Sequence, residues 1–112
     1  MLPPKNRLKK KSDFERVFKK GTGYKDDSLI LKTLKNNLET SRFGFIVSKK
    51  ISNKAVVRNK IRRILREIIK KNLPKIKTGL DVVFIANPGC KNKGFWDIEA
   101  VAEKLLYKAD MI

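Results

Sequence analysis

The stretch SKKISNKAVVRNKIRRILREIIKK, residues 48–71, places two kinds of side chain on two sides of one predicted helix. The apolar side chains recur at offsets of 4, 7 and 8 residues and form one stripe at 100° per residue: Val57, Ile61, Ile64, Leu65 and Ile68. The opposite stripe is polar and mostly basic: Asn59, Arg62, Arg63, Arg66 and Lys70. Only one acidic residue, Glu67, interrupts the stretch. We therefore expect a helix that buries one side in a core and presents the other to a polyanion.

The distribution of charge along the chain supports a nucleic-acid partner. The chain contains 28 Lys and Arg against 11 Asp and Glu, for a net charge of +17. Residues 49–77 contain 12 basic residues and one acidic residue, and residues 1–20 contain 8 basic and 2 acidic residues. A solvated charged surface would explain such runs in a near-neutral protein. At +17, self-repulsion opposes folding unless a partner neutralises it, which favours a polyanionic partner.

Length and composition indicate one small domain. A chain of 112 residues suits a single RNA-binding domain with a modest core, in which residues 1–8 are expected to form a flexible basic arm. No apolar run approaches the roughly 20 residues that span a bilayer, and the first residues lack the apolar stretch of a signal peptide. The single cysteine, Cys90, cannot form an internal disulfide and is expected in the core or at an edge. We expect a cytoplasmic protein, because free cysteine suits a reducing compartment.

The sequence argues against a self-sufficient enzyme. The chain contains no histidine, which is the usual general base and the commonest zinc ligand. Its carboxylates are scattered, and the only adjacent pair, Asp26–Asp27, is better explained as a polar turn. No glycine-rich phosphate loop is present. We therefore predict no catalytic residues and no metal site in the chain.

The order of predicted elements is typical of an α+β domain. A capping box at residues 12–15, SDFE, predicts a short helix that ends at Lys20 before Gly21. Strands are predicted over residues 28–34, 42–47 and 80–86. The basic helix lies between the last two and should end near Asn72, because Pro74 follows. This order suggests a βαβ unit with parallel strands.

A final amphipathic helix is predicted near the carboxyl end of the chain. Its apolar stripe consists of Ile98, Val101, Ala102, Leu105 and Leu106. Trp96, which precedes that stripe, is expected to be a packing anchor.

Two segments closely resemble the protein subunit of bacterial ribonuclease P. They are VSKKISNKAVVRNKIRRILRE at residues 47–67 and NRLKKKSDFERVFKKG at residues 6–21, and the later segments GLDVVFIA and FWDIEAVAEKLL occur in the matching order. The resemblance implies a single-domain two-layer sandwich of the ribosomal S5 domain 2-like type, with a four-stranded sheet, three main helices and a left-handed βαβ crossover.

The resemblance also implies a function. In that family the RNA subunit hydrolyses precursor tRNA, using Mg²⁺ bound through the RNA. The protein binds ribonuclease P RNA and the 5′ leader of precursor tRNA, and it promotes removal of the leader. We accordingly expect no cofactor on the protein alone, no membrane and no required protein partner.

The family motifs assign candidate residues to two sites. The residues expected to bind the catalytic RNA, with Lys70 added from the basic stripe, are Lys49, Lys50, Arg58, Asn59, Lys60, Arg62, Arg63, Arg66 and Lys70. Lys60 replaces the usual arginine, so it keeps the charge but lacks the planar fork that grips phosphate. The leader-binding cleft is expected at Phe14, Phe18, Ile30 and Lys32. Many relatives have an aromatic residue at Lys32, so a phosphate contact could replace stacking there.

Several alternatives remain open from the sequence. The spacing of Phe14, Val17 and Phe18 suits a purely core role as well as leader contact, and Asn59 could support the start of its helix. A basic ribosomal protein would share the charge and the fold class. A DNA-binding regulator would require a recognition helix and usually a dimer seam, for which no surplus apolar stripe exists. A basic helix can also lie on anionic membranes, but the core already needs this helix's apolar side.

Overall fold

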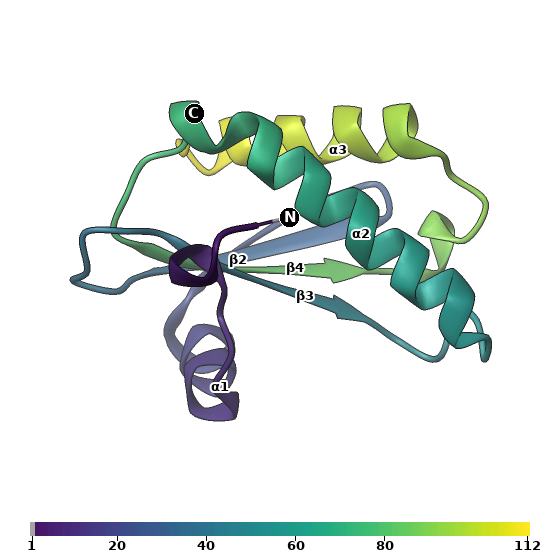
Figure 1. Ribbon diagram of the computed structural model, residues 1–112, viewed down its shortest axis with the longest axis horizontal. Helices are drawn as coiled ribbons and strands as arrows, with labels where there is room; N and C mark the ends of the chain where they lie inside the picture. Colours follow the sequence, from purple (N-terminus) through teal and green to yellow (C-terminus); the bar gives the residue numbers. More distant parts are fainter. Residues whose placement is uncertain (1) are drawn as a thin grey trace.

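Helices lie on both faces of a mixed four-stranded sheet in the computed structural model, which describes residues 2–112 (Figure 1). The elements in chain order are α1 (Lys11–Lys20), β1 (Thr22–Asp26), β2 (Leu29–Lys35), β3 (Arg42–Val47), α2 (Ala55–Asn72), β4 (Leu80–Ala86) and α3 (Phe95–Lys108). The strand order is β1-β2-β4-β3, and only β3 and β4 are parallel. The predicted strands and the predicted end of the basic helix are confirmed to within a residue.

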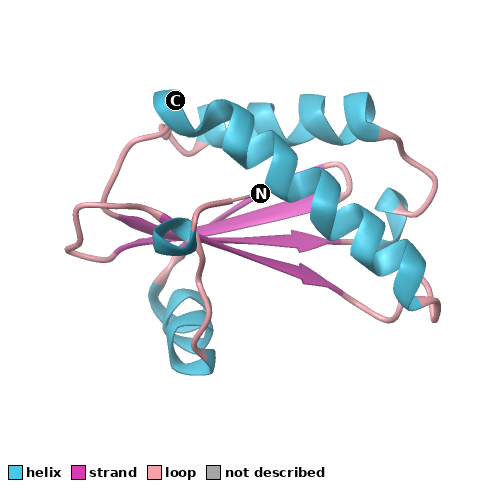
Figure 2. Cartoon of the chain, viewed as in Figure 1, coloured by secondary structure: helices cyan, strands magenta, loops and turns pink. Residues whose placement is uncertain are grey.

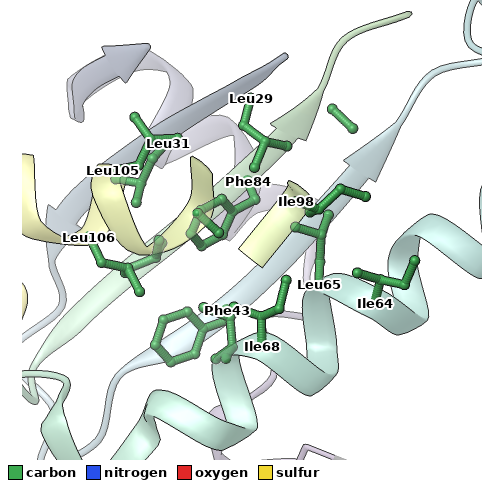
Figure 3. Packing of buried hydrophobic residues seen from close by; sticks show 14 of the residues in the cluster. Leu29, Leu31, Phe43, Ile64, Leu65, Ile68, Phe84, Ile98, Leu105 and Leu106 are labelled. Atoms are coloured by element: carbon green, nitrogen blue, oxygen red, sulfur yellow. The ribbon is translucent and has the colours of Figure 1, made fainter. Parts of the chain in front are cut away.

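The main core lies between the sheet and the pair α2 and α3, which cover one face (Figure 2). Alternate strand residues point to this face, as the period of two requires. Leu29, Leu31 and Phe84 from the sheet are fully buried, as are Leu65 of α2 and Leu105 of α3 (Figure 3). Burial of each such side chain contributes about 1.5–3 kcal/mol. The apolar stripe predicted for α2 therefore faces the core, and its basic stripe faces outward.

The connection between the parallel strands has the predicted hand. The chain runs along β3, rises into α2 and returns over the sheet before it enters β4 (Figure 1). Because β3 lies nearer to the viewer than β4 in this view, the βαβ crossover is left-handed, unlike most such units. The crossover carries α2 along the β3 edge of the sheet.

Residues 2–8 are packed against the domain, so the prediction of a flexible arm is wrong for them; residue 1 lies outside the described residues. Leu2 and Leu8 are 1% and 6% exposed. The backbone N–H of Leu8 donates to the carbonyl of Phe43 at 2.9 Å, and Asn6 Nδ2 donates to the Ser41 carbonyl at 2.8 Å. The segment thereby covers part of the open edge of β3.

Leu2→Ala should therefore lower the free energy of unfolding by about 2–5 kcal/mol, the usual cost of truncating a buried leucine. Urea unfolding followed by circular dichroism measures this change. Lys9→Ala, at the exposed position directly after this segment, serves as the control and should leave the midpoint unchanged. Equal midpoints for both variants would mean that the segment is detached in solution.

The start of α1 differs from the predicted capping box. Lys10 occupies the N-cap position and no side chain caps the helix, so Ser12 lies inside the first turn. The end is as predicted, because Gly21 follows the last residue and its N–H donates to the Val17 carbonyl at 2.8 Å. A Cβ at Gly21 would lie 2.4 Å from that oxygen, which explains the glycine.

Strand β1 was not located from the sequence. Its residues, TGYKD, lack a regular apolar alternation, and pairing with β2 stabilises them. The predicted turn at Asp26–Asp27 is confirmed, since Asp26 ends β1 and Asp27 adopts a left-handed φ of 48°. Aspartate tolerates this conformation better than most residues.

The residue that anchors the start of α3 is not the one that was predicted. Trp96 is 75% exposed, so the prediction that it anchors the core is wrong. Phe95 packs against the core instead, and the two rings meet edge to face with centroids 5.4 Å apart. Cys90 is buried as predicted, and burial raises the pKa of its thiol.

Candidate nucleic-acid interface

The outward side of α2 carries mostly basic side chains, with the exposed Glu67 among them. Most of its predicted RNA-binding residues are exposed: Asn59, Lys60, Arg63, Arg66 and Lys70. Arg58 and Arg62 are half-buried. Within residues 2–112, none of the six basic side chains from Arg58 to Lys70 has a carboxylate oxygen within 4.0 Å. Their charges therefore remain available to an external anion.

Two hydrogen bonds orient arginines on this surface. Arg62 Nη1 donates to Asn59 Oδ1 at 2.8 Å, one helical turn away. Arg58 Nη1 donates to the Ser52 carbonyl at 2.9 Å and ties the helix to the preceding loop. No side chain caps the start of α2, so Asn59 does not have the alternative role of supporting it. Asn59 instead holds a guanidinium in place.

The loop before α2 extends the basic surface. Lys49, Lys50 and Lys54 line a hollow together with Lys91, which follows the short turn Pro88–Cys90. No carboxylate lines this hollow. Lys49 and Lys50 were predicted from the sequence, but Lys91 was not, because only the fold brings that distant loop beside residues 49–54.

A second candidate surface lies on the opposite face of the sheet, which α1 covers only in part. Ile30, Ile85 and Ile46 lie side by side on β2, β4 and β3 and are half-buried. Lys32 lies two residues further along β2 on the same face, opposite Val83 of β4. We use the name groove for the part of this face that α1 leaves uncovered, together with the adjoining side of α1 (Figure 1); it contains the three isoleucines and Lys32. Ile30 and Lys32 were predicted from the sequence, but Ile46 and Ile85 were not, although the period-two pattern of their strands could have indicated them.

The structure separates the roles of the two phenylalanines of α1. Phe14 is half-buried, and its ring lies so close to Gly44 that a Cβ there would be 2.4 Å from ring carbons. Phe14 therefore packs α1 onto β3. Phe18 is 37% exposed, and the ammonium of Lys32 lies 5.7 Å from its ring centroid. Phe18 is therefore the more exposed of the two rings, and it is the one that lies beside Lys32.

A buried ion cluster fixes α1 on the sheet. The Asp81 side chain is fully buried and accepts two hydrogen bonds from Arg42, at 2.8 and 2.7 Å. Arg16 of α1 and Asn36 also donate to it, at 3.0 and 2.9 Å. Burial raises the pKa of Asp81, but the hydrogen bonds from Arg42 and Asn36 and the Arg42 charge outweigh burial, so the pKa is lowered overall. The cluster thereby holds one wall of the groove.

The side of the molecule around α3 is close to neutral. Lys104 and Lys108 lie 3.4 Å from Asp26, and Lys71 Nζ lies 2.8 Å from Glu99 Oε2. Within residues 2–112, the basic side chains without a carboxylate partner therefore lie elsewhere, mainly on α2 with its preceding loop and in the first 20 positions of the chain. Among residues 2–112 no group of three His, Cys, Asp or Glu side chains could hold a metal ion, and no helix could cross a membrane.

The fold and these surfaces define a small α+β protein with a basic helix that suits a nucleic-acid backbone and with a separate groove. Comparison with known proteins specifies the family. The chain belongs to the Ribonuclease P family, whose model matches residues 2–110. It is 43% identical over 107 residues to the ribonuclease P protein component of Alkaliphilus metalliredigens, with 96% of each chain covered. It is 41% identical to that of Clostridioides difficile, covering 93% of this chain and 91% of the relative.

Solved structures agree with this assignment. The structure of Staphylococcus aureus RNase P protein is 34% identical, with a TM-score of 0.88, and the match covers 95% of this chain and 96% of that one. The predicted fold class is therefore confirmed. The comparisons also support the ribonuclease P protein component over the ribosomal alternative.

Proposed function

We propose that this chain docks on ribonuclease P RNA through α2 and the loop 49–54, and that it binds the 5′ leader of precursor tRNA in the groove. In this proposal the RNA subunit hydrolyses the phosphodiester bond and binds the Mg²⁺ that the reaction needs. The observation that carries the proposal is the row of six basic side chains on α2 that have no carboxylate partner within residues 2–112.

Docking would occur by neutralisation of phosphates. Arginine and lysine contacts to phosphate fix position without reading sequence, and they release counterions from the RNA. Arg62, held by Asn59, is preorganised for such a contact, which reduces the entropy lost on binding. Neutralisation by α2 would lower repulsion between RNA segments, so the complex should need less Mg²⁺ than the RNA alone.

The groove would hold the leader as an extended single strand. Its floor of three half-buried isoleucines offers apolar contact to bases, and Lys32 offers a cation at the side. A mature tRNA has no leader and would gain nothing from these contacts. The groove would therefore favour precursor over product.

Cleavage of precursor tRNA by a bacterial ribonuclease P RNA at low Mg²⁺, with and without the chain, tests this function. We expect strong activation by the chain, and greater activation when the leader is several nucleotides long than when it is a single nucleotide. Activation that is equal for both leaders would retain the docking role and remove the leader role. No activation, with the RNA active at high Mg²⁺, would contradict the whole proposal.

A further inference from the structure

Lys32 supplies a positive charge to the groove, and its ammonium contacts both the ring and the backbone carbonyl of Phe18. The Lys32 ammonium lies 5.7 Å from the centroid of the Phe18 ring and donates to the Phe18 carbonyl at 3.3 Å. No carboxylate oxygen lies within 4.0 Å of it among residues 2–112. The protein thus positions this charge without neutralising it.

Three features keep the Lys32 side chain in this place. Its aliphatic stem lies across Gly23 of β1, where a Cβ would be 3.7 Å from Cε and 3.9 Å from Cγ. The carbonyl that it binds belongs to the last turn of α1, where the helix dipole favours a cation. The ring of Phe18 adds a cation–π contact. A lysine fixed in this way loses less rotamer entropy on binding a ligand than a free one.

The same contact changes the role expected of Phe18. One face of an aromatic ring cannot accept both an ammonium and a stacked nucleobase. The ammonium has three protons and uses one for the Phe18 carbonyl, so two remain for an anionic oxygen. A phosphate of a single strand in the groove is the ligand that matches this donor.

We propose that Lys32 binds a backbone phosphate of the leader and that Phe18 acts as its positioning residue, not as a platform for a base. This inference rests on the proposed leader-binding function. It leads to two expectations that direct stacking of Phe18 on a base does not. Loss of the ring should act through the charge of Lys32, and the effect should not depend on the bases of the leader.

The test uses the chain assembled with a bacterial ribonuclease P RNA, and it measures the affinities for precursor and mature tRNA over a range of salt concentrations. The variants are Phe18→Leu, Lys32→Met and the double variant, each of which keeps apolar bulk. Lys35→Met is the matched control, because Lys35 is an exposed lysine of the same strand at an odd offset, which places it on the other face. Each precursor is prepared with an ordinary leader and with an abasic leader.

We expect both single variants to reduce the preference for precursor by about three- to tenfold, with the double variant no worse than Lys32→Met. Both should lower the salt slope of precursor binding by about 0.7, the value for one phosphate on a single strand. The losses should be the same on the abasic leader, and Lys35→Met should match the wild type. The affinity for ribonuclease P RNA and the unfolding midpoint should not change.

Two results would overturn the inference while leaving the proposed function intact. The first is a Phe18→Leu effect that vanishes on the abasic leader and leaves the salt slope unchanged, as direct stacking predicts. The second is an unaltered preference for precursor in Lys32→Met, which is informative even if Phe18→Leu fails to fold. Equal wild-type affinity for precursor and mature tRNA would overturn the proposed leader role together with this inference.

Discussion

Replacing Arg62 and Arg66 together by alanine should weaken binding to ribonuclease P RNA by about 10- to 100-fold and reduce the salt slope by about one to two. Both residues lie on the outward side of α2, and neither has a carboxylate partner within residues 2–112. Each would neutralise about one phosphate, and each such contact releases counterions, so the loss should be largest at low salt. Alanine is the best helix former, so α2 should persist.

A matched control separates docking from net charge. The double variant Lys104→Ala and Lys108→Ala also removes two positive charges, but from α3, where both lysines lie beside Asp26. Filter binding or fluorescence anisotropy over a salt series measures both double variants. If α2 is the docking surface, the α3 variant should bind nearly as well as the wild type. Equal losses would show that long-range attraction to a +17 chain, and not this helix face, determines affinity.

The features that the sequence predicted well are those with local periodicity. The two stripes of α2 follow from a 3.6-residue repeat over 18 residues. This repeat is visible in the sequence of the helix alone, without knowledge of the elements that pack against it. The strands β3 and β4 have runs of large apolar residues with glycine or proline nearby. The basic residues of the stripe opposite the core were found for the same reason, because their spacing alone determines that they share a face, whereas the family motif assigned Arg58 and Lys60.

The features that it missed depend on contacts between distant segments. Leu2 and Leu8 are separated by polar residues and resemble a tail, but the open edge of β3 buries them. Phe95 lies three residues before Ile98 and so continues the apolar stripe of α3, whereas Trp96 is rotated by 100° from Phe95. The helical pattern could therefore have identified Phe95, and not Trp96, as the packing residue. Lys91 could not be identified from a local pattern, because its place beside residues 49–54 depends on the fold.

The Asp81 cluster also lies beyond sequence analysis. Asp81 stands in the run LDVVFIA, where the pattern indicates only a buried strand. Its partners Arg16 and Arg42 come from α1 and β3, 65 and 39 positions away. A buried carboxylate with two arginines resembles a functional site in isolation. Its place behind α1 gives it a structural role, since it sets the position of one wall of the groove.

Asp81→Asn should lower the free energy of unfolding by about 2–4 kcal/mol at pH 7, because it leaves two guanidinium groups without their buried anion. The expected loss of stability is somewhat smaller than the usual cost of breaking a buried ion pair, because the Arg42 and Arg16 side chains are 23% and 43% exposed. Asp97→Asn, at an exposed position of α3, should have little effect. Urea unfolding of both variants measures the difference.

The same variant should show a defined pH dependence. The pKa of Asp81 is lowered in the folded protein, so its carboxylate adds stability that is fully present above the unfolded pKa of about 3.9. That stability is lost as the pH falls through the folded pKa. The gap in unfolding free energy between the wild type and Asp81→Asn should therefore be constant from pH 7 to about 5 and should narrow below about 4. A gap that narrowed near neutral pH would mean that Asp81 is protonated there and that the cluster does not hold α1 by charge.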